Sequence, residues 1–370
     1  TTGADTFIFN GTDSGTVQSI THDNFENFSG GNGDDIFTLN GGTITNSVDA
    51  GGNNDTLNLD DVANTIVVTD NNEITATGTG GFTNLENLNG GTSSDDLSFH
   101  DGFTLSGSID LSAGTDSVDY SAYTSAISIS LDDFPNIESL TGGSGSDTLN
   151  GFSAGTIFTL SNTDTGTTDE SGGGESILFN SFESLVGVGA SDILNLTNTA
   201  NATVLTGTGA GTTTDLSGTF SSIGTVNAGT ATGDSLTAPG TNDTLNITGS
   251  GSGTITGILA FSGYENLGGG AGDDIFNLNG GLITGTISGG GGDDALDVID
   301  VGTLIAANQT ITFNGEGQTL GDSITISDTA IVDSTTYLFS YNNDGGIAIT
   351  TGPNRATITY TGLEPITDNL

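Results

Sequence analysis

The sequence predicts an all-β protein, a parallel β-helix (β-solenoid) with turns of about 20 residues. Two observations lead to this fold class. A short motif recurs along the chain, and several of its copies lie 20 or 21 residues apart. The residues after each copy alternate between apolar and polar, which is typical of strands, whereas sustained helical periodicity is missing. We therefore expect successive turns to stack and to bury their apolar faces against one another.

One recurring element is an apolar residue, a glutamate, a small polar residue and a second apolar residue. It occurs five times, and an aspartate follows each glutamate after nine residues. We expect these glutamates to be structural, because equivalent copies form a lattice rather than one unique site. They would bond backbone amides at a corner, act as ligands, or lie beside an asparagine ladder built from Asn27, Asn87 and Asn266. The five glutamates are Glu26, Glu86, Glu138, Glu183 and Glu265.

The aspartates lie in a second motif, Gly-Gly-x-Gly-x-Asp-x-apolar-x. Complete copies span 30–38, 142–150, 269–277 and 289–297. Glycine readily adopts the positive φ angles of tight turns, and the residues after the aspartate alternate as strands do. Each copy therefore predicts a turn that leads into a strand.

The motifs divide the chain into a β-solenoid over 1–297 and a β-rich C-terminal part over 298–370, which ends in a partial repeat. In the C-terminal part the motifs become rare, and a small sheet or sandwich is expected. Its predicted strands are 309–313, 323–327, 336–341 and 347–350, with a hairpin turn at 342–346. The long spacings 55–95 and 147–192 would hold a turn without the motif, or a loop such as 162–175.

The charge balance is extreme, with 46 acidic residues against one basic residue and a formal net charge of −45. This excludes nucleic acid and anionic membrane surfaces as partners, because both need Lys or Arg. No apolar run reaches membrane-spanning length, so we expect no membrane insertion. The carboxylates require screening cations, and Asp-rich turns suit Ca²⁺. With no cysteine available for disulfides, a metal would take over their stabilising role in a secreted, extracellular protein.

The aspartate turn resembles the hemolysin-type (RTX-like) calcium-binding repeat of secreted bacterial toxins, adhesins and surface-layer proteins. That resemblance implies a parallel β-roll with Ca²⁺ between stacked turns, bound by the aspartate and by turn carbonyls. The best candidate sites are the stacked pairs 35/55, 95/116 and 274/294. The copies here stand alone, so the aspartates could instead only bond backbone amides. The matching ligands are Asp35, Asp55, Asp95, Asp116, Asp147, Asp274 and Asp294.

A longer pattern, Tyr-Thr-Gly-Leu-Glu before an aspartate turn, resembles the repeats of giant bacterial adhesin-like surface proteins, which implies surface display. The segment 358–366 aligns with 259–267, and the start at 3–7 is similar to the second half of an aspartate turn. We therefore expect units to continue end to end, as tandem repeats or as subunits that self-associate head to tail.

These features predict a structural subunit or repeat unit of an extracellular filament, surface layer or adhesin stalk, stiffened by Ca²⁺, and not an enzyme. No Ser-His-Asp arrangement follows from the spacing of His22 and His100, the two histidines. Two alternatives stay open. One is a ligand-binding adhesin module with a glycan or cell-surface partner. The other is a β-helix carbohydrate-active enzyme, which would show a groove with clustered aromatic residues and paired carboxylates.

Overall fold

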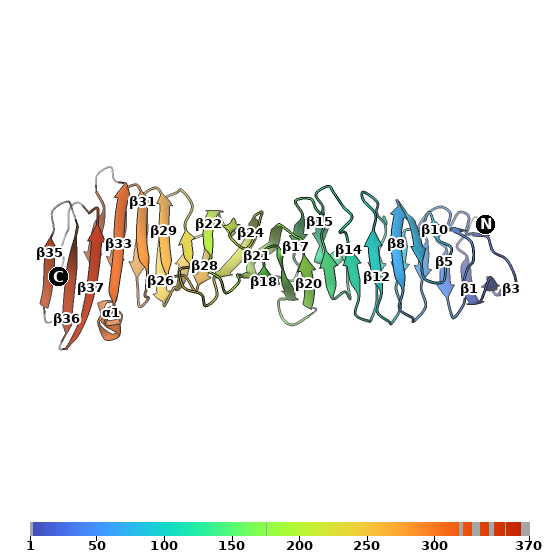
Figure 1. The fold of residues 1–370 in the computed structure, drawn as a ribbon, viewed down its shortest axis with the longest axis horizontal. Helices are drawn as coiled ribbons and strands as arrows, with labels where there is room; N and C mark the ends of the chain where they lie inside the picture. Colours follow the sequence, from blue (N-terminus) through green and yellow to red (C-terminus); the bar gives the residue numbers. More distant parts are fainter. Residues whose placement is uncertain are drawn as a thin grey trace. The chain divides into compact units, whose positions relative to one another are not determined.

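The computed structural model describes residues 3–174, 176–317, 321–327, 334–339, 344–351 and 353–363. These residues are nearly all β, and many of the strands pair in parallel, which confirms the predicted all-β class (Figure 1). The described ranges contain one α-helix, α1 (Val301–Ala307), and one short 3₁₀ helix, η1 (Leu131–Asp133). In these ranges no helix has both the length and the apolar character needed to cross a membrane.

The chain forms two compact units. The first consists of Thr1–Ala154 and Asp164–Leu185, and the second of Gly155–Thr163 and Val186–Leu370. Strand β21 (Ser184–Asn195) runs from the first unit into the second. The first unit also contains β1 (Thr6–Gly11), β2 (Ser14–Val17), β3 (Ile20–His22), β4 (Phe28–Ser29), β5 (Ile36–Leu39), β6 (Val48–Asp49), β7 (Thr56–Asn58), β8 (Thr65–Asp70), β9 (Glu73–Ala76), β10 (Phe82–Thr83), β11 (Asn87–Asn89), β12 (Asp96–Phe99), β13 (Ile109–Asp110), β14 (Ser117–Asp119), β15 (Ser128–Ser130), β16 (Ser139–Thr141), β17 (Thr148–Asn150), β19 (Thr165–Glu170) and β20 (Ser176–Asn180).

The second unit continues the same kind of architecture. Helix α1 lies in this unit. Its strands are β18 (Thr156–Asn162), β22 (Ala202–Gly207), β23 (Ala210–Thr213), β24 (Phe220–Asn227), β25 (Ser235–Thr237), β26 (Thr244–Gly249), β27 (Ser252–Ile255), β28 (Leu259–Ser262), β29 (Asn266–Ala271), β30 (Ile275–Leu278), β31 (Thr286–Gly291), β32 (Ala295–Val298), β33 (Thr310–Gly317), β34 (Ser323–Ile326), β35 (Ser334–Phe339), β36 (Gly345–Thr351) and β37 (Asn354–Thr361).

The strands that follow the aspartate turns pair in parallel and in register. In the first unit β5 pairs with β7, so that Ile36 lies opposite Thr56, and β12 pairs with β14. In the second unit β30 pairs with β32, and Ile275 lies opposite Ala295. The prediction that turns 20 or 21 residues apart lie next to each other is confirmed for all three pairs.

The longer spacings contain an additional antiparallel hairpin. Between Asp55 and Asp95, strand β9 pairs antiparallel with both β8 and β10. Between Asp147 and Asp192, β19 pairs antiparallel with β20. The predicted loop over 162–175 is therefore wrong for 165–170, where alternating burial accompanies a strand. Residue 175 lies outside the described residues.

The core is built from one side of each short strand. In β5 the side chains of Phe37 and Leu39 are buried while Thr38 between them is half-buried, because successive side chains of a strand point to opposite faces. Equivalent residues of neighbouring parallel strands then stack. The rings of Phe7 and Phe37 lie 4.6 Å apart between centroids and are nearly parallel.

Beyond residue 298 the parallel pairing continues. Strand β33 pairs with β31, and β34 pairs with β32. The predicted strands over 309–313, 323–327 and 347–350 are found as β33, β34 and β36, and β35 covers the described part of 336–341. Residues 342 and 343 of the predicted hairpin turn lie outside the described residues. The two compact units divide elsewhere, and the domain boundary at 297/298 stays a prediction.

Candidate functional site

The seven aspartates predicted as metal ligands are all buried, with at most 1% of each residue exposed. Their Oδ1 atoms accept hydrogen bonds from backbone N–H groups of the preceding strand's turn. The Asp35 N–H donates to Asp55 Oδ1 at 2.7 Å, and the Asp5 N–H donates to Asp35 Oδ1 at 2.6 Å. Each aspartate thus receives a bond from one neighbour and donates its own N–H to the next.

We call such a series a carboxylate run, in which each backbone N–H is bonded to a carboxylate one strand further on. In the first unit the runs are 5–35–55–86, 64–95–116–138 and 127–147–183. In the second unit they are 156–192, 201–234–265 and 243–274–294–322.

Four of the five repeated glutamates end a carboxylate run. Glu86 Oε2 accepts the Asp55 N–H at 2.9 Å, and Glu265 Oε2 accepts the Asp234 N–H at 3.0 Å. Glu138 and Glu183 do the same for Asp116 and Asp147. The prediction that these glutamates bond backbone amides is confirmed for these four. The fifth glutamate, Glu26, is exposed and accepts no hydrogen bond within the described part of the chain.

The constant nine-residue offset from glutamate to aspartate follows from this arrangement. Glu86 ends one run, and Asp95, nine residues on, belongs to the next. The same holds for Glu265 and Asp274 in the second unit. The nine residues are the length of chain that crosses from one carboxylate run to its neighbour.

The second carboxylate oxygen of most run members is buried without a partner. Glycines make room for it. A Cβ at Gly269 would lie 2.2 Å from Asp274 Oδ2, and one at Gly30 would lie 2.2 Å from Asp35 Oδ2. Asp147 differs, because its Oδ2 accepts the Gly143 N–H at 2.7 Å. The unpartnered atoms are Oδ2 of Asp35, Asp55, Asp95, Asp116, Asp234, Asp274, Asp294 and Asp322.

Burial raises the pKa of these carboxyl groups, because the charged form loses hydration. The pKa rises to about 6 for Asp55, about 7 for Asp274 and about 6 for Asp322. In each case burial is the main cause and neighbouring carboxylates add to it, while the hydrogen bond from the backbone acts in the opposite direction. Burial also raises the pKa of Asp95, Asp116, Asp234 and Asp294.

The aspartates fit a calcium ion in one respect and lack something in another. Six of the seven predicted ligands, all except Asp147, keep a buried oxygen without a partner, and hard oxygen atoms are what Ca²⁺ prefers. Across the described ranges, however, no three acidic or histidine side chains gather closely enough to share an ion. Since Ca²⁺ takes about six to eight oxygen ligands, turn carbonyls and water would complete its shell. The calcium site stays a prediction.

Two polar features differ from the sequence-based expectation. Asn87 and Asn266 do not form a ladder, because their Nδ2 atoms donate to the carbonyls of Asp55 and Asp234. Other asparagines stack side chain to side chain, in the pairs 58/89, 195/227 and 246/277. Sequence analysis also missed the buried Asn64 and Asn201, whose backbone N–H groups begin two runs. Their distances of 31 and 33 residues from the bonded aspartates were the available signal.

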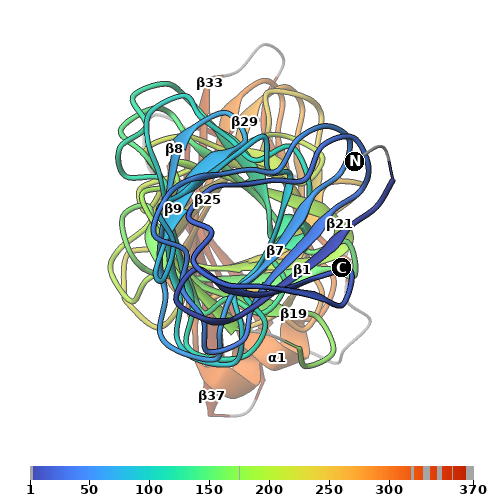
Figure 2. The same ribbon diagram turned by 90° about the vertical axis from the view of Figure 1, so that its right-hand side faces the viewer.

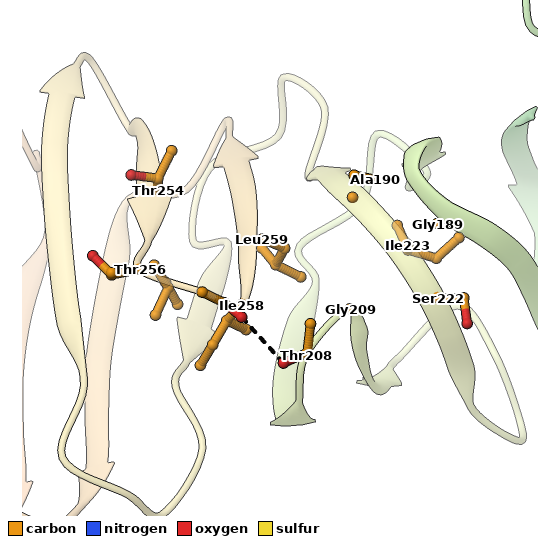
Figure 3. A pocket seen from close by; sticks show the side chains of 13 residues that line it. Gly189, Ala190, Thr208, Gly209, Ser222, Ile223, Thr254, Thr256, Ile258 and Leu259 are labelled. Atoms are coloured by element: carbon orange, nitrogen blue, oxygen red, sulfur yellow. Dashed lines mark hydrogen bonds between the residues drawn. The ribbon is translucent and has the colours of Figure 1, made fainter.

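The second unit has a groove of about 670 Å³. Thr208 Oγ1 donates to the Gly257 carbonyl at 3.1 Å within it (Figure 3). Its lining consists of Gly, Ala, Ser, Thr, Ile and Leu residues, so it offers hydroxyl groups and apolar surface but no titratable side chain.

The first unit has a groove of about 590 Å³ with different chemistry. It combines the carboxylates of Asp110, Asp132 and Asp133 with the rings of Tyr120 and Phe134. Tyr120 also stacks on Phe99, another lining residue, at 4.3 Å between centroids. Two of the carboxylates already accept hydrogen bonds: Asp110 from the Ser112 N–H and Asp132 from the Ser153 N–H.

Comparison with known proteins identifies no family. No family model matches the chain, and no curated protein matches it. Among solved structures, the extracellular lipase LipA from Serratia marcescens aligns with 89% of this chain at 11% sequence identity, with a TM-score of 0.16. The chain spans 43% of the length of that lipase.

This comparison corrects one expectation. The sequence predicted that the chain is not an enzyme, and the structural neighbour is an enzyme, so that prediction is contradicted and is withdrawn. A likeness at this TM-score carries no argument for a lipase reaction in this chain.

Proposed function

We propose that this chain is a structural unit of an extracellular filament, surface layer or adhesin stalk. In this proposal it folds as a β-solenoid, is stiffened by Ca²⁺, and continues end to end with neighbouring units. The carboxylate runs are the observation that carries the proposal. The same bond, from a backbone N–H to a buried carboxylate one strand further on, recurs in both units. Chemistry repeated in this way suits a framework.

The runs would make a stack of strands resistant to local opening. Separating two neighbouring strands would leave a buried N–H and a buried carboxylate oxygen unpaired. Each such loss costs about 1–3 kcal/mol, and more when the group is charged. Opening at one point therefore meets a penalty at every layer that it crosses.

The surface charge fits an extracellular setting. With a net charge of −45, units repel one another sideways and stay separate until cations bridge them. The chain has a single basic residue, Arg355, so proteases that cut after Lys or Arg find almost no site. Both properties suit a protein that lasts outside a cell.

Calcium would act on the unpartnered oxygens of the runs. The donors would be Oδ2 of Asp35 and Asp55, of Asp95 and Asp116, and of Asp274 and Asp294, the three pairs in which parallel strands are in register. A bound cation would supply positive charge where neighbouring carboxylates repel. Asp147 is a weaker candidate, because both of its oxygens already accept backbone N–H groups.

Thermal unfolding with calcium and with a chelator tests the proposal. We expect the melting temperature to fall when calcium is removed, and electron micrographs to show filaments in calcium. Asp35→Asn with Asp55→Asn should reduce the calcium effect, whereas Asp34→Asn, at an exposed neighbour, should preserve it. An unchanged melting temperature on chelation would remove calcium from the account.

A second candidate function is saccharide binding in the groove of the first unit. Its aromatic rings and carboxylates are the combination that carbohydrate sites use. Titration with acidic and neutral oligosaccharides, followed by tyrosine fluorescence, would test it. Asp133→Asn should weaken binding if the groove is used, and Asp119→Asn, which lies outside the lining, should not.

A further inference from the structure

The N-terminal end of the first unit is a copy of an interior element. The segment 20–28 aligns residue for residue with 259–267. Strand β3 pairs with β2 in the register that β28 uses with β27, with Ile20 in the place of Leu259 and His22 in the place of Phe261. The following strands match too, because Phe28 lies opposite Val48 and Leu267 lies opposite Ile287.

The two copies differ in what covers them. Leu259 is 6% exposed and Tyr264 is fully buried, whereas Ile20 is 74% exposed and Phe25, in the place of Tyr264, is 59% exposed. The interior copy is covered by strands of its own chain. Phe261 lies opposite Val226 of β24, and Leu267 lies opposite Leu236 of β25. In the N-terminal copy β3 is the last strand of its sheet (Figures 1 and 2).

The polar groups of this end match the same pattern. In the interior copy Glu265 accepts the Asp234 N–H, and the neighbouring Asn266 donates to the Asp234 carbonyl. Glu86 and Asn87 do the same with Asp55 in the first unit. Glu26 and Asn27 are the equivalent pair, and both are exposed. They present an acceptor and a donor spaced for the backbone of one extended residue.

We infer that this face, formed by Ile20, Phe25, Glu26, Asn27 and Phe28, docks onto the C-terminal layer of a second copy of this chain, residues 323–363. The occupant is a second copy because this chain's own strands cover the equivalent faces, with a backbone amide opposite the glutamate and apolar side chains opposite the apolar positions. Docking would add parallel strands to an exposed sheet edge, a common mode of β association. The inference deepens the proposed end-to-end continuation and rests on it.

Two full-length double variants test the face by sedimentation velocity at physiological ionic strength, where charge repulsion is screened beyond about 8 Å. We expect the wild type to associate as its concentration rises, and Ile20→Asp with Phe25→Asp to stay monomeric. The control is Val62→Asp with Leu178→Asp, two side chains of the first unit that are 51% and 50% exposed. It should associate like the wild type, and circular dichroism should show that both variants are folded.

Cross-linking identifies the occupant, because the chain contains no cysteine and a single one can be placed at will. Phe25→Cys carrying a photoreactive label should give a covalent dimer linked to residues 323–363 of the second copy, and Val62→Cys should not. A monomeric wild type, a double variant that still associates, or links elsewhere would overturn the inference. The calcium shift of the melting temperature, measured on the same samples, reports separately on the proposed function.

Discussion

Asp274 and Asp294 lie on neighbouring parallel strands, and the backbone N–H of Asp274 donates to Asp294 Oδ1 at 2.8 Å. Asp274 in turn accepts the Asp243 N–H at 2.7 Å. One buried side chain therefore links three layers of strands. Because the same relationship recurs along both units, its energetics determine much of the stability of this chain.

Asp274→Ala should destabilise the second unit. At pH 5 the carboxyl group is largely neutral, and its loss leaves the Asp243 N–H buried without an acceptor. We expect a cost of about 1–3 kcal/mol in the free energy of unfolding. Asp273→Ala removes an identical but exposed residue and should cost less. Chemical denaturation of both variants makes the comparison, and equal costs would contradict the structural role of the run.

Stability should fall as the pH rises from about 4 to about 7 in calcium-free buffer. The pKa of Asp274 is raised from 3.8 to about 7, so the folded state binds this proton more tightly than the unfolded state. The stabilisation is fully present below the unfolded pKa and is lost as the pH rises through the folded one.

General repulsion among carboxylates acts in the same direction, so a matched pair of variants isolates the buried group. Asp274→Asn should flatten the pH profile of the melting temperature, and Asp273→Asn should leave it near that of the wild type. Parallel profiles for the two variants would show that the buried group does not titrate in this range.

Gly290→Ala should destabilise the protein strongly, and Gly291→Ala should not. Gly290 has a φ of +104°, and a Cβ there would lie 2.0 Å from the Gly270 carbonyl oxygen of the neighbouring strand. The backbone conformation alone costs about 1–2 kcal/mol for a residue with a side chain. Gly291 has an ordinary φ, and a Cβ added there would meet no atom within 4 Å. Melting temperatures of the two variants test this, and a tolerated Gly290→Ala would refute the close backbone approach.

His22→Phe should stabilise the first unit. Both ring nitrogens of His22 are buried without a partner, and the ring lies 5.0 Å from Phe28 and 5.7 Å from Phe9 between centroids. The equivalent residues of other copies are Phe82 and Phe261. Removing unpaired buried polar atoms should add about 1–3 kcal/mol. His100→Phe, at an exposed position, is the control, and denaturation below the concentration of self-association is the measurement.

The turns and their pairing could be predicted because the information is local and repeated. A glycine turn, an aspartate and a following apolar alternation fix one strand, and a spacing of 20 residues places Asp35 beside Asp55. The hairpins could not be predicted from the same motif, since strands such as β9 and β19 lack it. They appeared in the sequence only as irregular spacing.

Helix α1 and the buried Asn64 show the limits of the sequence. Helix α1 has seven residues, too few for a periodic pattern, and is stabilised by burial of Val301, Leu304 and Ile305 and by the Asp300 cap. Asn64 contributes to its run through its backbone N–H and bonds Asp95 Oδ1 with its side chain as well. Backbone contributions of this kind are independent of residue type, so no sequence motif marks them.

Electron cryomicroscopy of the purified chain in calcium tests the central claim most directly. The account predicts filaments whose reconstruction shows parallel strands stacked about 4.8 Å apart along the filament axis, from one copy into the next. Isolated particles, or filaments in which the strands of one copy do not continue onto the next, would contradict it.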